Sequence, residues 1–107
     1  MEPRNYLLAF PVKGDVIAPL AESEKIAVIE LKGGESNLHY IQPPSLPQNL
    51  LNRLDYWILP PNDRSGDQFL EEGIEVLTTP TAPMEINEII EAFLFRELFR
   101  YQPGGGD

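Results

Sequence analysis

The chain has 107 residues, and its 17 acidic side chains against 8 basic ones give it a formal net charge of −9. This charge opposes binding to nucleic acids and to anionic membranes, because both interactions depend on Lys and Arg side chains. The chain has no cysteine, which excludes disulfides, thiolate metal sites and cysteine nucleophiles.

The length is that of one domain, which we place at residues 1–101, followed by a flexible C-terminal tail over residues 102–107. The first apolar run, residues 6–10, ends at Pro11 and is too short for a signal peptide or a membrane span. We therefore expect a cytoplasmic protein.

Three strands are predicted in the first half of the chain. Residues 6–12 are nearly all apolar, as expected of a strand covered on both faces, and residues 25–31 are rich in β-branched side chains. A short extended piece over residues 16–20 connects them. The glycine pair 33–34 forms a turn of hairpin type, so that residues 37–42 run antiparallel to the second strand.

Helices and strands alternate in the second half. The predicted elements are, in order, a helix over residues 48–54, a buried strand over 55–60 that holds the only Trp, a short helix over 65–73, a strand over 74–78, and an amphipathic helix from Met84 to about Tyr101.

This order of elements, β-β-β-α-β-α-β-α, predicts an α/β domain. It contains one mixed five-stranded sheet with helices on both faces. Right-handed crossovers place the first and fourth strands side by side at the centre of the sheet. Their carboxyl ends then form a topological switch point, lined by residues 13–19, 61–66 and 78–81, where sheets of this kind bind ligands.

Polar residues gather in the loops of this predicted switch point. The candidate ligand-binding residues are Asp15, Asn62, Asp63, Ser65 and Gly66. Ser65 and Gly66 open a helix directly after a strand, and the free N–H groups at such a position suit an anion.

A second interpretation uses the carboxylates of Asp15, Asp63 and Asp67. Three converging carboxylates suit magnesium, which a ribonuclease-H-like nuclease requires. Such a nuclease also needs a carboxylate within the first strand, and residues 6–12 contain none. Turn formation is the ordinary role of Asp residues in loops.

His39 is the only imidazole and the candidate metal ligand, while a half-exposed structural role is its ordinary interpretation. Phe95, Phe99 and Tyr101 widen the apolar surface of the last helix. They either cover the edge of the sheet or form a surface for a protein partner or for self-association.

Several segments resemble the dinitrogenase iron–molybdenum cofactor family, whose NifX-like domain is also found at the end of NifB proteins. The resemblance covers most of residues 6–98. The segments that carry it are Leu8-Ala9-Phe10-Pro11-Val12 with Asp15 and Ile17, Lys25-Ile26-Ala27-Val28-Ile29, Leu54-Asp55-Tyr56-Trp57-Ile58-Leu59, Phe69-Leu70-Glu71-Glu72-Gly73-Ile74-Glu75-Val76 and the amphipathic end helix.

The resemblance implies a ribonuclease-H-like three-layer sandwich and a non-catalytic accessory or carrier protein for iron–molybdenum cofactor or its iron–sulfur precursors. Three segments depart from the family pattern, so that no family ligand is carried over to this chain. Pro19-Leu20-Ala21 replaces a His-Phe-Gly segment, Gln42-Pro43-Pro44-Ser45 replaces a His- and Gly-rich loop, and Pro60-Pro61-Asn62-Asp63 stands where glycine is usual. The alternative is a protein-interaction module that retains the fold without binding a cofactor.

Overall fold

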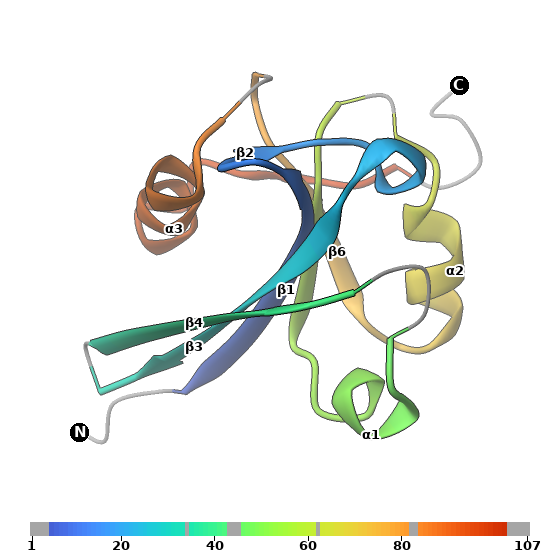
Figure 1. Ribbon diagram of the computed structural model, residues 1–107, viewed down its shortest axis with the longest axis horizontal. Coiled ribbons are helices and arrows are strands. Elements are labelled where there is room, and N and C mark those ends of the chain that lie inside the picture. The colour runs from blue at the N-terminus through green and yellow to red at the C-terminus, as the bar shows by residue number, and fades with distance from the viewer. Residues whose placement is uncertain (1–4, 34, 43–45, 62, 82–83, 103–107) are drawn as a thin grey trace.

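The computed structural model describes residues 5–33, 35–42, 46–61, 63–81 and 84–102, and these build one curved sheet flanked by helices (Figure 1). Its strands follow the order β4-β3-β1-β5-β6-β7, with β2 paired to β1. The strands are β1 (Tyr6–Lys13), β2 (Val16–Ile17), β3 (Lys25–Lys32), β4 (Glu35–Ile41), β5 (Tyr56–Leu59), β6 (Glu75–Thr78) and β7 (Phe99–Arg100).

The pairing confirms the predicted mixed sheet. β3 runs antiparallel to both β1 and β4, whereas β5 runs parallel to β1 and β6. All five predicted strands form, and β1 lies beside β5 at the centre, in the register Leu8↔Tyr56 and Ala9↔Trp57. The predicted count of five strands is too low, because the short extended piece pairs as β2 and the C-terminal segment pairs as β7.

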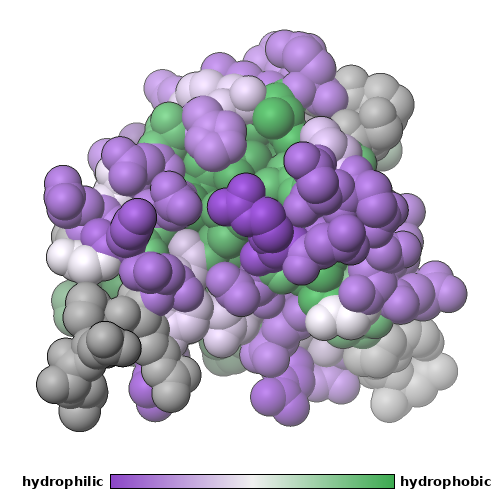
Figure 2. Space-filling view, turned by 90° about the horizontal axis from the view of Figure 1, so that it is seen from below, coloured by the Kyte–Doolittle hydropathy of each residue, from purple (hydrophilic) through white to green (hydrophobic). Residues whose placement is uncertain are grey.

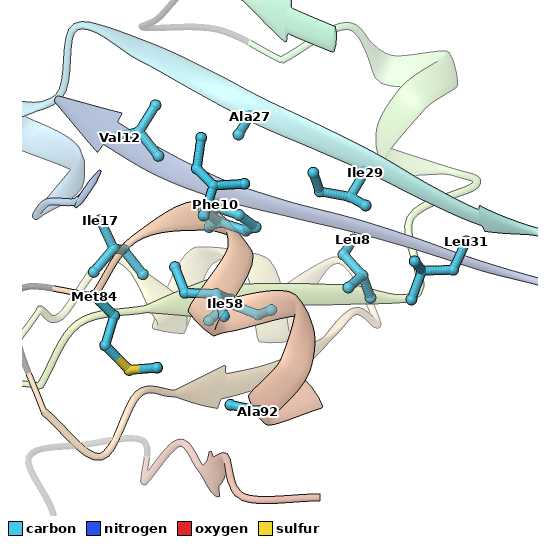
Figure 3. Close-up of a cluster of buried hydrophobic side chains, with 12 residues drawn as sticks. Leu8, Phe10, Val12, Ile17, Ala27, Ile29, Leu31, Ile58, Met84 and Ala92 are labelled. Atoms are coloured by element: carbon cyan, nitrogen blue, oxygen red, sulfur yellow. The ribbon is translucent and has the colours of Figure 1, made fainter. Parts of the chain in front are cut away.

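Helices cover both faces of the sheet. The helical elements are a 3-10 turn (Leu20–Glu22), α1 (Gln48–Leu51), α2 (Gly66–Glu71) and α3 (Ile86–Leu94). Successive side chains of a strand point to opposite faces of the sheet. Alternate residues of β1 therefore pack in two hydrophobic cores, one on each face. Leu8, Phe10 and Val12 pack toward α3 (Figure 3), whereas Leu7 and Ala9 pack with Trp57 and the residues of α1 and α2.

The α/β class is therefore confirmed, while the ribonuclease-H-like name for its layering stays a prediction. Figure 2 shows the molecule from below, with apolar patches lying between the hydrophilic side chains that cover much of that face. No helix in the described part of the chain is long and apolar enough to cross a membrane.

The last helix is shorter than predicted. α3 ends at Leu94, and the chain reverses through Arg96, which has a left-handed φ of 59°. The N–H of Glu97 donates to the carbonyl of Ala92 (2.8 Å) and that of Arg96 to Phe93 (3.2 Å), the two hydrogen bonds of a Schellman helix end. The prediction of a helix to Tyr101 is wrong, because residues 99–100 pair with the edge strand β6 and form β7.

Replacing Arg96 by glycine should stabilise the fold. A side chain in the left-handed region costs about 1 kcal/mol that glycine avoids, so Arg96→Gly is expected to raise the free energy of unfolding by about 1 kcal/mol. Urea titration measures the change. The matched control is Glu91→Gly in the helical part of α3, which should lower the same quantity by about 1 kcal/mol. Destabilisation by both variants would contradict the assigned helix end.

Candidate functional site at the switch point

A hollow opens beside the carboxyl ends of the central strands β1 and β5. It has a volume of about 610 Å³, within the range of small-molecule sites in proteins. Its walls come from the 3-10 turn after β2 and from the start of α2. The lining residues are Leu20, Ala21, Ser23, Asp63, Arg64, Ser65 and Gln68. Two of the predicted site residues, Asp63 and Ser65, therefore lie in this hollow.

Asp63 holds the two walls together. One carboxylate oxygen accepts the backbone N–H of Leu20 (2.8 Å), and the other accepts the N–H of Ser65 (2.9 Å). Hydrogen bonds to a charged acceptor are among the stronger ones in proteins, so this side chain ties the 3-10 turn to the loop before α2. Asp63 thus has a structural role that combines the turn-forming interpretation with a position at the site.

Ser65 stands at the N-cap position of α2, but its side chain makes no capping hydrogen bond. Its hydroxyl oxygen is buried and has no hydrogen-bond partner among the described residues. A buried hydroxyl without a partner is costly and uncommon in folded proteins. Ser65 thus begins α2 without capping it through its side chain, and its hydroxyl is a polar group at the site whose role the fold does not account for.

Gly66 is buried because Tyr101 packs directly on its backbone. A Cβ placed on Gly66 would lie 2.8 Å from a ring carbon of Tyr101, which is too close for any side chain. The hydroxyl of Tyr101 donates to a carboxylate oxygen of Asp67 (2.9 Å) and lies 3.3 Å from the carbonyl oxygen of Arg64. Gly66 thus allows the ring of Tyr101 to pack closely on the backbone. The ring lies against the start of α2, which forms one wall of the hollow.

For Tyr101 this position agrees with the first alternative, cover of the sheet edge, and not with the second, a surface for a partner. Its side chain is buried in the core that contains Trp57 and Phe69, whereas Phe95 and Phe99 are exposed. The pairing of β7 with β6 brings Tyr101 to this position. The backbone N–H of Tyr101 continues that pairing, because it donates to the carbonyl of Val76 (3.0 Å).

Tyr101 should make stability fall in alkaline solution. Burial, and then the hydrogen bond and the charge of Asp67, raise the pKa of Tyr101 above its ordinary value of 10.0. The folded state thus holds this proton more tightly than the unfolded state does. The resulting stabilisation is complete below pH 10.0 and is lost as the pH rises through the raised pKa.

Urea titrations of the wild type and of Tyr101→Phe between about pH 9 and about pH 11 measure this effect. The wild type should lose stability over this range more steeply than the variant does. Tyr40→Phe, on the exposed strand β4, serves as the control for the removal of a tyrosine hydroxyl. Equal slopes for the wild type and Tyr101→Phe would contradict the assigned environment.

The other candidate residues do not line the hollow. Asp15 is exposed in the turn between β1 and β2, and its carbonyl oxygen accepts the N–H of Ile86 (3.1 Å), which places it beside α3. His39 is exposed on β4, two strands away from β1. Asn62 lies outside the described residues. Thr79 is buried and donates its backbone N–H to Leu59, and residues 78–81 are not among those that line this hollow.

The carboxylates of Asp15, Asp63 and Asp67 do not converge on one point. Within the described ranges, no three His, Asp or Glu side chains form a group that could hold a metal ion. Asp63 binds backbone N–H groups, and Asp67 accepts the hydroxyl of Tyr101. The arrangement required by a magnesium-dependent nuclease is thus not found in this part of the chain.

The hollow also lacks the donors that iron–sulfur clusters use. Such clusters are held by cysteine thiolates or by imidazole. The chain has no cysteine, and His39 is not among the residues that line the hollow. The side chains at the switch point therefore do not fit direct ligation of an iron–molybdenum or iron–sulfur cluster.

Arg64 lies within the predicted lining at residues 61–66, but sequence reasoning missed four other wall residues, Leu20, Ala21, Ser23 and Gln68. The polar bend at residues 21–24 was the available signal, but only the hydrogen bond from Leu20 to Asp63 brings that bend to the site.

Comparison with known proteins supports the fold. The sequence matches no model of a protein family and no curated protein. Its structure is similar to a crystal structure from Methanocaldococcus jannaschii that carries a provisional assignment as a dinitrogenase. The TM-score is 0.76 at 12% sequence identity, and the match covers 94% of this chain and 99% of the other. The two chains share a fold. The likeness is thus to a dinitrogenase-related fold, in agreement with the resemblance noted in the sequence.

Proposed function

We propose that this chain is a non-catalytic accessory protein that carries a metal–sulfur cofactor, of the iron–molybdenum type or an iron–sulfur precursor. In this proposal the cargo occupies the hollow at the switch point. The observation that carries it is the position and size of this hollow, about 610 Å³ beside the ends of β1 and β5. Ligands of open α/β sheets bind at such places. The fold shared with the M. jannaschii protein supports the same assignment.

The cargo would be held without a protein ligand on its metals. Polar groups in the walls, Arg64 and Gln68, are hydrogen-bond donors of the kind that suit the outer sulfur and oxygen atoms of an anionic cluster. Carriage by outer contacts also suits a protein that receives and then releases its cargo, since no metal–protein bond has to be broken.

Anaerobic titration with isolated iron–molybdenum cofactor, and separately with a synthetic iron–sulfur cluster, tests the proposal. Absorbance of the cluster that co-elutes with the protein during gel filtration is the readout. We expect saturable binding of at least one of the two in the micromolar range. His39→Ala should bind as the wild type does, because His39 lies outside the hollow. No binding of either cluster would overturn the proposal.

A protein-interaction module is the second candidate. The exposed fractions of Leu94, Phe95 and Phe99 are 58%, 73% and 60%, which is unusual for large apolar side chains so close together in the chain. The interaction would use this face in place of the hollow. A pull-down with wild-type and Phe99→Glu protein tests it, and capture of the same proteins by both would remove this candidate.

A further inference from the structure

We propose that β4 pairs with β4 of a second copy of this chain, in antiparallel register centred on Leu38, to form one continuous sheet across a two-fold axis. This inference is independent of the proposed cargo and of the face formed by Leu94, Phe95 and Phe99.

β4 is an open edge. It is the first strand in the order β4-β3-β1-β5-β6-β7, and no other described strand pairs with its outer side. Residues 35–40 are all exposed, and the free end of the β3–β4 hairpin extends beyond the helices (Figure 1). An unpaired edge presents a row of backbone N–H and C=O groups that another strand can bind. At seven residues, β4 is long enough for a stable ladder.

β4 lacks the features that proteins use to block such an edge. Natural edges are protected by lysine, proline, bulges or inward-pointing charges. The segment Glu-Ser-Asn-Leu-His-Tyr-Ile contains neither lysine nor proline, and it pairs with β3 in unbroken register from Ile26↔Ile41 to Lys32↔Glu35. Its single acidic residue, Glu35, lies at the end of the strand. The edge is therefore regular and open to a partner strand.

The exposed side chains of β4 favour a second copy as that partner. Leu38 and Tyr40 are 44% and 39% exposed, and both point to the α3 face, because they lie opposite Ile29 and Ala27 of that core. Pairing centred on Leu38 sets Leu38 against its own symmetry mate and Tyr40 against Ser36. Diagonal neighbours lie within reach across a strand pair, so Leu38 and Tyr40 of both copies would cover one another.

The charges along the strand agree with this register. Glu35 would lie opposite Ile41, and Asn37 opposite His39, so no two like charges face each other. The ammonium nitrogen of Lys25 lies 3.9 Å from the centre of the Tyr40 ring on the same copy. The net charge of −9 on each copy predicts that added salt, by screening repulsion, increases the dimer fraction.

Single cysteine variants test the register, since the natural chain has no cysteine. Residues directly opposite across an antiparallel pair have Cβ atoms roughly 5 Å apart, close to disulfide geometry. Leu38→Cys should therefore form a disulfide dimer readily under mild oxidation. The matched control Ser36→Cys should not, because the two copies of residue 36 would lie about 14 Å apart along the strands.

Light scattering on the wild type, Leu38→Lys and Phe99→Glu completes the test. We expect a dimer for the wild type and for Phe99→Glu at high micromolar concentration, and a monomer for Leu38→Lys, which sets two like charges against each other at the axis. A monomeric wild type, a Leu38→Lys variant that remains dimeric, or equal disulfide yields at positions 36 and 38 would each overturn the inference.

Discussion

Replacing Trp57 by alanine should lower the free energy of unfolding by about 3–5 kcal/mol, the range for large aromatic residues removed from a core. Trp57 is fully buried in β5 and stacks on Phe69 of α2, with ring centres 4.0 Å apart and planes at 17°. It thus joins the central strand to the helix that forms one wall of the hollow. The variant loses both the buried surface and this contact between the strand and the helix.

Urea titration followed by circular dichroism measures the loss, since the variant has no tryptophan to report by fluorescence. The control Phe95→Ala, on an exposed side chain, should change stability by less than about 0.5 kcal/mol. The indole N–H of Trp57 has no hydrogen-bond partner in the described part of the chain. Trp57→Phe removes this unpaired donor and should therefore cost clearly less than Trp57→Ala. Equal losses for the two variants would contradict this account.

Replacing Asp63 by alanine should cost about 2–3 kcal/mol, although the side chain lies in a loop. Both of its carboxylate oxygens accept backbone N–H groups, at 2.8 and 2.9 Å, and the alanine variant would leave the donors of Leu20 and Ser65 without this acceptor. Asp63→Asn keeps one oxygen acceptor and should lose about half as much. The change in the urea midpoint measures both effects.

Asp15→Ala is the matched control for Asp63→Ala, because Asp15 also follows a central strand but its carboxylate is exposed. We expect a change below about 0.5 kcal/mol. If Asp63→Ala were as well tolerated as Asp15→Ala, Asp63 would not be the residue that joins the two walls of the hollow.

The central part of the fold was predictable because its signals are local. The apolar runs of β1, β3 and β5 each form a strand, and β3 pairs with β4 as the predicted hairpin requires. Alternation of helices with strands then places β1 beside β5, since a parallel pair requires a crossover. These inferences need no knowledge of distant contacts, and the pairing confirms them.

The C-terminal segment was not predictable in this way. Leu94, Leu98 and the Phe residues between and after them fit a continued helical stripe as well as they fit a turn and a strand. The choice depends on the open edge of β6, which lies far away in the sequence, and on a left-handed turn at Arg96 in place of the usual glycine. Burial of Tyr101 against Gly66 is a consequence of the same pairing.

The site was predicted in part. Asp63 and Ser65 lie in the hollow because the loop after β5 must end at the switch point. Asp15 follows β1 just as closely, yet the turn into β2 carries it to the α3 side of the sheet. The order of residues shows which strand a loop follows. It does not show toward which face of the sheet that loop folds.

The location of the proposed cargo is best tested by comparing two identical changes of charge. Gln68→Glu adds a negative charge to the wall of the hollow, and Gln42→Glu adds the same charge just beyond β4. Anaerobic titration of iron–molybdenum cofactor or iron–sulfur cluster into each variant gives its affinity. A cargo held in the hollow predicts at least about tenfold weaker binding for Gln68→Glu, corresponding to about 1.4 kcal/mol, and wild-type binding for Gln42→Glu. Equal affinity in both variants, or no binding by the wild type, would contradict the account.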